Sequence, residues 1–180
     1  MIYKTEPLSR AQIRRYANAI RSLVFPEGGL NFPVIDFLEC IHLIAGDEDF
    51  YYECVPDDEL PWGVHAAYDL NENCIKIKES VYLGACKGVG RDRMTIVHEI
   101  GHFLFLRHCS LQLHRCFEEN VPIYCDPEWQ AKCFAAELLI PADRVAGMSA
   151  EEIAQECGVS IQAARYQLTK IPVKKEKRSS

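Results

Sequence analysis

Residues 95–106 read TIVHEIGHFLFL, and this stretch organises the rest of the chain. Its apolar residues cover most of a helix circumference, which is typical of a largely buried helix. His98 and His102 are four residues apart, so both imidazoles lie on one face of that helix and can reach a single metal ion. Glu99 points toward the same cleft. Polar groups inside a buried helix need partners, and a metal ion would satisfy all three side chains.

This pattern indicates the chemistry of a zinc peptidase, in which a carboxylate acts as general base toward water. The competing interpretation is a pair of histidines on an ordinary amphipathic helix. A third ligand from another element favours the metal interpretation. Asp92 is expected to cap the helix, after the turn at residues 88–90.

The chain has 180 residues, 48% hydrophobic and 26% charged, which fits one soluble globular domain with a small appendage. No apolar run approaches the roughly 18 residues of a membrane span, so no membrane partner is expected. The N-terminus lacks an apolar signal region, which predicts a cytoplasmic protein. A net charge of -6 argues against nucleic acid as a partner.

The chain contains nine cysteines, and none is spaced as a Cys-x-x-Cys pair. In a cytosol they are expected to be reduced thiols, most of them buried. The alternative is a second metal or redox site in the segment after the motif helix. Its candidate residues are His108, Cys109, His114, Cys116 and Cys125.

Two helices are expected near the N-terminus. Ser9 can cap the first, whose apolar residues recur at three- and four-residue steps up to residue 24. The second spans residues 34–45 and ends at Gly46. The other face of the first helix is basic and is interpreted as a solvated surface. Its arginines are Arg10, Arg14, Arg15 and Arg21.

Between residues 50 and 78 the pattern becomes extended. Strands are expected at residues 50–55, 64–68 and 74–78, with a hairpin connection at 69–73. In the last strand, Lys76 and Lys78 alternate with apolar residues, which suits the protected edge of a sheet.

Helices are also expected in the second half of the chain. A short one covers residues 79–85, and a longer one runs from Pro127 to Pro141 with Asp126 as its cap. Ser149 and Glu152 form a capping box that opens a helix to Gly158, and Ser160 caps a last helix. These elements divide the chain into a metallopeptidase domain (1–145), a C-terminal helical hairpin (146–172) and a basic tail (173–180).

A catalytic zinc takes three protein ligands and leaves a fourth position for water. The carboxylate candidates downstream are Glu118, Glu119, Asp126, Glu128 and Glu137. Glu128 lies in the first turn of an Ala-rich helix that can pack closely on the motif helix. Glu137 lies deeper and could instead accept a hydrogen bond from a ligand histidine. Glu118 and Glu119 are interpreted as surface carboxylates.

The chain resembles the ImmA/IrrE family of metallopeptidases. The resemblance rests on HEIGH (98–102), on the run from Glu128 through FAAELLIP (134–141), and on the Ala, Gly-Val-Ser, Ala and Leu pattern of residues 154–168. It covers roughly residues 60–170. Many relatives carry an acidic residue where this chain has Gln130 and an Asn where it has Lys132. A further His found in many relatives is matched only loosely by His108.

The resemblance implies an α+β fold with a zincin-like core. A small antiparallel sheet would pack on the HExxH helix, and a helical hairpin would follow. It also implies a Zn²⁺ site in which Glu128 completes the set begun by His98 and His102, with Glu99 as the base. Understood members of the family cut helix-turn-helix repressors of stress or mobile-element genes, so such a repressor is the expected protein substrate.

Two further features of the site are expected. The extended substrate would lie along the strand at residues 74–78, because added main-chain hydrogen bonds orient a peptide. The oxyanion stabiliser has three candidates, namely Tyr124, His108 and His114.

The alternative interpretation is a DNA- or repressor-binding module whose metal site is not catalytic. The turn at residues 158–160 between two short helices has the form of a helix-turn-helix. Its second helix offers only Gln162, Arg165 and Gln167 for contacts to DNA. Because these contacts are few and the net charge is negative, we favour the interpretation that the hairpin closes the peptidase core.

Overall fold

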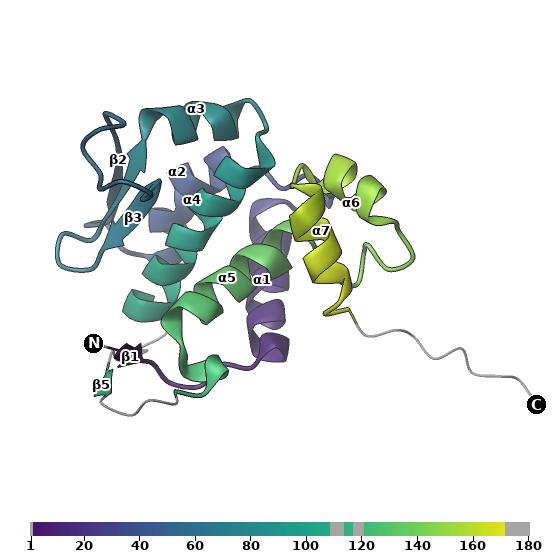
Figure 1. The fold of residues 1–180 in the computed structure, drawn as a ribbon, viewed down its shortest axis with the longest axis horizontal. Helices are drawn as coiled ribbons and strands as arrows, with labels where there is room; N and C mark the ends of the chain where they lie inside the picture. The colour runs from purple at the N-terminus through teal and green to yellow at the C-terminus, as the bar shows by residue number, and fades with distance from the viewer. Residues whose placement is uncertain (1, 109–113, 117–120, 172–180) are drawn as a thin grey trace, which may run out of the picture.

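A computed structural model describes residues 2–108, 114–116 and 121–171 of the chain (Figure 1). The protein is mainly helical with a small sheet, which confirms the α+β class. The elements in chain order are β1 (Ile2–Lys4), α1 (Arg10–Val24), α2 (Val34–Ala45), β2 (Tyr51–Val55), β3 (Ala66–Asp69), β4 (Cys74–Lys78), α3 (Glu79–Cys86), α4 (Gly90–Phe103), the π-helical turn η1 (Leu104–His108), β5 (His114–Cys116), the 3₁₀ turn η2 (Ile123–Cys125), α5 (Pro127–Leu139), α6 (Ala150–Cys157) and α7 (Ile161–Leu168).

The helix boundaries follow local signals in the sequence. Side-chain caps are present at Ser9, Asp126, Ser149 and Ser160, and Gly46 ends α2 in the left-handed conformation. Each cap satisfies backbone N–H or C=O groups that have no partner within the helix. Three α-helices of the described residues, α2, α3 and the helix of the metal motif, begin without a side-chain cap. α4 begins at Gly90 with Val89 as its N-cap residue, and the expected cap, Asp92, lies within its first turn.

The main sheet has three strands in the order β2-β4-β3. β4 pairs antiparallel with β3, as the hairpin predicts, but parallel with β2, so the sheet is mixed where an antiparallel one was expected. β4 is also the central strand, and its expected position at the edge is wrong. The alternating lysines mark one solvent-facing side of the sheet, which a central strand can also have. On that side Lys76 lies 3.5 Å from Glu53 on β2 and 3.3 Å from Glu72.

α4 occupies the centre of the fold and contacts α5, α3 and β3. Its close approach to α5 depends on Gly101, inside the HEIGH motif. A Cβ at this position would lie 3.2 Å from Cα of Ala131 and 3.2 Å from Cδ1 of Phe134. The small residues therefore allow the two helices that carry the candidate metal ligands to pack against each other.

The basic face of α1 is solvated only in part. Arg15 is exposed as expected, but Arg10, Arg14 and Arg21 have partners in the protein. Arg21 is 3% exposed and donates a 2.6 Å hydrogen bond to the carbonyl of Leu138. Arg10 and Arg14 reach α5, where they bind the fully buried Glu137 at 2.8 and 2.7 Å. These arginines join α1 to the C-terminal half of α5. Glu137 is therefore the partner of α1 and not an acceptor for a ligand histidine.

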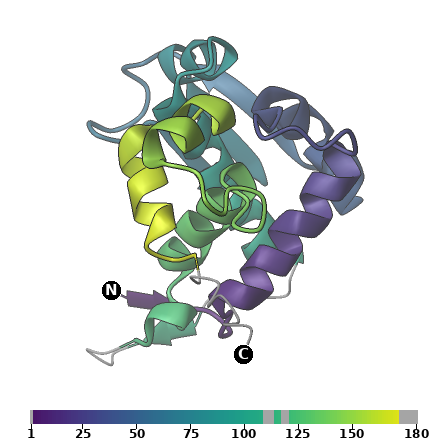
Figure 2. The same cartoon turned by 90° about the vertical axis from the view of Figure 1, so that its right-hand side faces the viewer.

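The helical hairpin α6–α7 lies on the side of the molecule opposite the sheet, as Figures 1 and 2 show. Gly158 forms the turn between the helices in the left-handed conformation. The turn rests directly on the start of α4, since a Cβ at Gly90 would lie 2.6 Å from the backbone of Val159. Arg93 of α4 is buried and donates to the carbonyl of Cys157 at 3.3 Å. These contacts tie the hairpin to the motif helix.

The second helix of the hairpin exposes only part of the set of side chains expected to contact DNA. Gln167 is fully buried and donates to the carbonyl of Ile140 at 3.3 Å, so its expected availability for DNA is wrong. Arg165 is exposed and lies 3.3 Å from Glu151 of α6. Of the three expected contacts, Gln162 and Arg165 remain at the surface.

No helix among the described residues is long and apolar enough to cross a membrane. The cysteines whose side chains are described are free thiols, namely Cys40, Cys54, Cys74, Cys86, Cys125, Cys133 and Cys157. Of the residues considered for a second metal or redox site, only Cys125 has a described side chain. The side chains of His108, Cys109, His114 and Cys116 lie outside the described residues.

Candidate metal centre and active site

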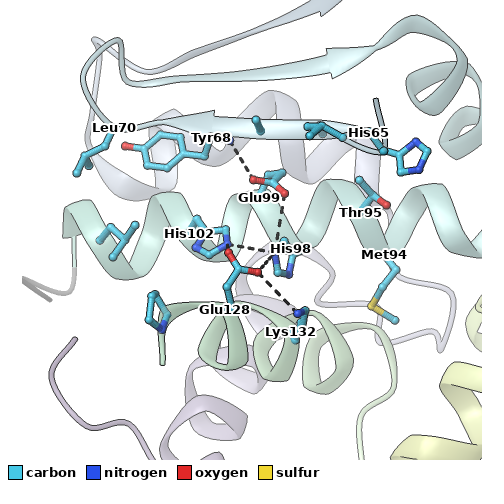
Figure 3. A pocket seen from close by; sticks show the side chains of 16 residues that line it. His65, Tyr68, Leu70, Met94, Thr95, His98, Glu99, His102, Glu128 and Lys132 are labelled. Carbon is cyan, nitrogen blue, oxygen red and sulfur yellow. Dashed lines mark hydrogen bonds and ion pairs between the residues drawn. The ribbon is translucent and has the colours of Figure 1, made fainter. Parts of the chain in front are cut away.

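The two motif histidines converge at the surface of α4. Their Nε2 atoms are 3.1 Å apart, and the ring planes are inclined at 87° with centroids 4.7 Å apart. This is the arrangement expected of residues four apart on one helix face. Figure 3 shows both rings directed toward α5, where Glu128 lies.

Glu128 approaches the histidines from the first turn of α5. The side chain of Asp126 caps this helix by accepting a 2.9 Å hydrogen bond from the Glu128 N–H. Oε1 of Glu128 lies 3.1 Å from Nε2 of His102, and Oε2 lies 3.4 Å from Nε2 of His98. The hydrogen bonds from His102 and His98 hold the pKa of Glu128 well below its usual range. The carboxylate is therefore ionised, as a metal ligand must be.

The convergence of these three residues suits a zinc ion. Tetrahedral bonds of about 2.0–2.1 Å place neighbouring ligand atoms about 3.3 Å apart. The two imidazole nitrogens are 3.1 Å apart, and each Glu128 oxygen lies 3.1 or 3.4 Å from one of them. Among the described residues, this is the one group of three His, Cys, Asp or Glu side chains whose ligand atoms converge. Two imidazoles and one carboxylate would also leave a fourth position open, as catalytic zinc sites do.

Glu99 lies beside the convergent ligands without being one of them. It is 9% exposed, and its Oε2 accepts a 2.9 Å hydrogen bond from the backbone N–H of Tyr68 on β3. Its Oε1 lies 3.9 Å from Nε2 of His98. Burial raises the pKa of Glu99, while the two histidines and the Tyr68 N–H oppose that rise. A carboxyl group with a raised pKa is suited to accepting and returning a proton near neutral pH.

The ligands and Glu99 open into a cleft of about 810 Å³ (Figure 3). β3 forms one wall, α4 the floor, and the first turns of α5 the opposite wall. β3 is an edge strand, so alternate residues direct their main-chain groups away from β4 and into the cleft. Tyr68 is one of these residues, because its backbone N–H donates a hydrogen bond to Glu99. The edge beside the site is therefore β3, and not the strand at residues 74–78.

Two side chains that were not selected from the sequence also line the cleft. Nζ of Lys132 is 3.7 Å from Oε2 of Glu128, and its four-residue spacing from Glu128 could have placed it there. His65 precedes β3 and contacts the guanidinium of Arg91. No sequence signal indicated that His65 lines the cleft, because its position depends on the pairing of β3 with β4.

Of the three expected oxyanion stabilisers, only Tyr124 has a described side chain, and it does not line the cleft. Tyr124 lies in η2, is 47% exposed, and is not part of the cleft wall. The side chains of His108 and His114 lie outside the described residues. The structure therefore brings together His98, Glu99, His102 and Glu128 but leaves Tyr124 apart.

An HExxH helix, a glutamate from a following helix and an adjacent edge strand together define the metallopeptidase class. Residues 61–169 match the peptidase family described as the IrrE N-terminal-like domain, and the chain belongs to this family. The resemblance read from the HEIGH and FAAELLIP motifs is confirmed.

A solved structure described as a Mycobacterium tuberculosis transcriptional regulator has a similar fold, with a TM-score of 0.60 and 15% sequence identity. The similarity covers 94% of this chain and 49% of the other, so this chain spans about half the length of that protein. At this level of identity, the likeness shows the fold alone. No curated protein sequence gives a significant match.

Proposed function

We propose that this chain is a cytoplasmic zinc-dependent endopeptidase that cleaves a helix-turn-helix transcriptional repressor at a specific site. The observation that carries the proposal is the convergence of His98, His102 and Glu128 beside the buried carboxylate of Glu99. A purely structural metal site would have no use for that carboxylate. In this proposal residues 1–145 form the peptidase domain, 146–172 the hairpin that closes its core, and 173–180 a basic tail.

The three ligand residues would hold zinc, which when bound supplies Lewis-acid activation of water and of the scissile carbonyl. Glu99 accepts a proton from the attacking water and delivers it to the leaving amine. The Tyr68 N–H holds Oε2 of Glu99, which leaves Oε1 on the side facing His98. Because Glu99 is buried, bulk water competes little for these hydrogen bonds.

The substrate would bind as an extended strand along the open edge of β3. Main-chain groups of this edge face the cleft, and they can pair with a peptide of any sequence. The scissile bond would then pass between β3 and the start of α5, above Glu99. The family resemblance favours a repressor as the substrate. The description of the structural neighbour as a transcriptional regulator is consistent with a role of this chain in transcription.

Metal content tests the ligand assignment. The purified protein should contain one zinc per chain, and His98→Ala, His102→Ala and Glu128→Ala should each lose most of it. Glu137→Gln is the matched control on α5, because Glu137 binds α1 instead of the metal centre. Full zinc retention in all three ligand variants would remove the metal site from the proposal.

Catalysis is tested with Glu99→Gln, which keeps the shape of the side chain but cannot accept the proton. This variant should retain zinc, while turnover falls by about two orders of magnitude or more. The assay is incubation with a helix-turn-helix repressor encoded beside this gene, with and without a chelator. Unchanged cleavage by Glu99→Gln would assign the base to another group, and cleavage that survives chelation would contradict a zinc enzyme.

A further inference from the structure

A second cavity lies next to the metal cleft, between α5 and α7. Its volume is about 420 Å³, within the roughly 300–1,000 Å³ of small-molecule sites. The two cavities share Met94, His98 and Lys132 in their walls. His98, one of the three candidate metal ligands, therefore lines both cavities. A substrate residue adjacent to the scissile bond would be within reach of both.

The walls of this cavity are mostly apolar, although Ser160 and Gln162 also line it. Trp129 from α5 and Tyr166 from α7 provide aromatic surface, and Tyr166 is 52% exposed. Ala136 and Ala163 are small, and this keeps the space between the two helices open. Arg10 fixes one wall, since its guanidinium lies 5.9 Å from the centroid of the Trp129 ring.

The two basic side chains at the cavity do not favour an acidic substrate residue. Arg10 pairs with Glu137 at 2.8 Å, and Lys132 is 69% exposed, so its ammonium group can remain in water. An acidic side chain would have to compete with Glu137 for Arg10 and with water for Lys132. An uncharged side chain gains by covering aromatic and methyl surface instead.

We propose that this cavity is a specificity pocket for a large apolar or aromatic side chain of the substrate, adjacent to the scissile bond on the side toward the C-terminal hairpin. The inference rests on the proposed peptidase function. It gives α7 a direct part in substrate selection, because α7 supplies one wall of the pocket.

Cleavage of a proteome-derived peptide library, read by mass spectrometry, tests the pocket. The zinc-loaded protein should cut bonds flanked at one fixed position by Phe, Leu or Met about tenfold more often than bonds flanked there by Ala. Ala163→Phe places a ring in the cavity and should abolish this preference while zinc content stays at one per chain. Ala19→Phe, at an exposed site on α1 outside the pocket, is the matched control and should keep it.

Binding provides a second readout that does not need turnover. The chain has two tryptophans, and Trp62 is fully exposed, so Trp62→Phe leaves Trp129 as the single reporter in the pocket wall. N-acetyl-phenylalanine amide should change its fluorescence in a saturable manner, and N-acetyl-alanine amide should not. Addition of Ala163→Phe should remove the response.

The outcomes separate the two proposals. Chelator-sensitive cleavage that ignores side-chain size, or that keeps its preference in Ala163→Phe, overturns the pocket and leaves the peptidase standing. If neither the library nor the repressor is cut, the failure falls on the proposed function. The fluorescence of Trp129 then decides the pocket, which a missing or Ala163→Phe-insensitive response overturns.

Discussion

Replacement of Glu137 by Gln should destabilise the protein without removing its metal. Glu137 is fully buried and accepts three hydrogen bonds from arginine, from Arg10 at 2.8 Å and from Arg14 at 2.7 and 3.2 Å. The hydrogen bond to Glu137 is also the main reason that the pKa of Arg14 is raised. Gln removes the negative charge and puts an NH₂ donor against guanidinium groups, which cannot accept a hydrogen bond.

The size of the loss follows from burial. Breaking a fully buried ion pair costs roughly 3–5 kcal/mol. Arg10 and Arg14 are 19% and 23% exposed, so water can partly solvate them after the change. We therefore expect the free energy of unfolding to fall by about 3 kcal/mol, which lowers Tm by roughly 6–12 °C for a chain of this size.

The assay is denaturant unfolding of the metal-free protein, because bound zinc would add its own contribution to stability. Glu128→Gln is the control on the same helix. Its side chain is 57% exposed, so in metal-free protein this variant should change stability by less than 1 kcal/mol, while its zinc content falls. A stability loss below 1 kcal/mol for Glu137→Gln would refute the buried-pair argument. Loss of zinc from a folded Glu137→Gln variant would show that Glu137 contributes to the metal centre.

Two further predictions concern close packing and thiol reactivity. Gly90→Ala should lower the free energy of unfolding by about 1–3 kcal/mol in urea unfolding, because its methyl group would lie 2.6 Å from the backbone of Val159; a stabilised variant would show that the hairpin does not rest on α4. Burial raises the pKa of Cys133 to about 12 and of Cys157 to about 11, so both should remain protonated and unreacted with iodoacetamide at pH 8 in the native protein but not in denaturant. Mass spectrometry of the alkylated peptides measures this, and rapid native labelling of either thiol would contradict its burial.

Several features of the protein follow from the sequence because the interactions that produce them are local. The caps at Ser9 and Ser149 depend on hydrogen bonds between residues three positions apart. The approach of His98 and His102 follows from the helical period alone. Pro127 and Asp126 mark the start of α5 and place Glu128 in its first turn, and the family resemblance made Glu128 the third candidate ligand.

Other features were decided only by tertiary structure. Glu128 and Glu137 lie on the same helix, and the sequence left both with a possible place at the metal centre. Their different surroundings depend on α1, whose Arg10 and Arg14 lie more than 120 positions away and meet Glu137. Local pattern made these arginines part of a solvated basic face, because a helix period shows where a side chain points but not which element covers it.

The strand order has the same origin. The alternation of polar and apolar residues in β4 shows which face of the strand is exposed to solvent. It does not show whether the strand has a neighbouring strand along one edge or along both. The parallel pairing with β2, whose residues lie more than 20 positions before their partners, makes β4 central and leaves β3 as the edge beside Glu99. Residue patterns report hydrogen bonds and periodicity over a few positions, whereas strand order and the burial of charges depend on the combined packing of segments far apart in the chain.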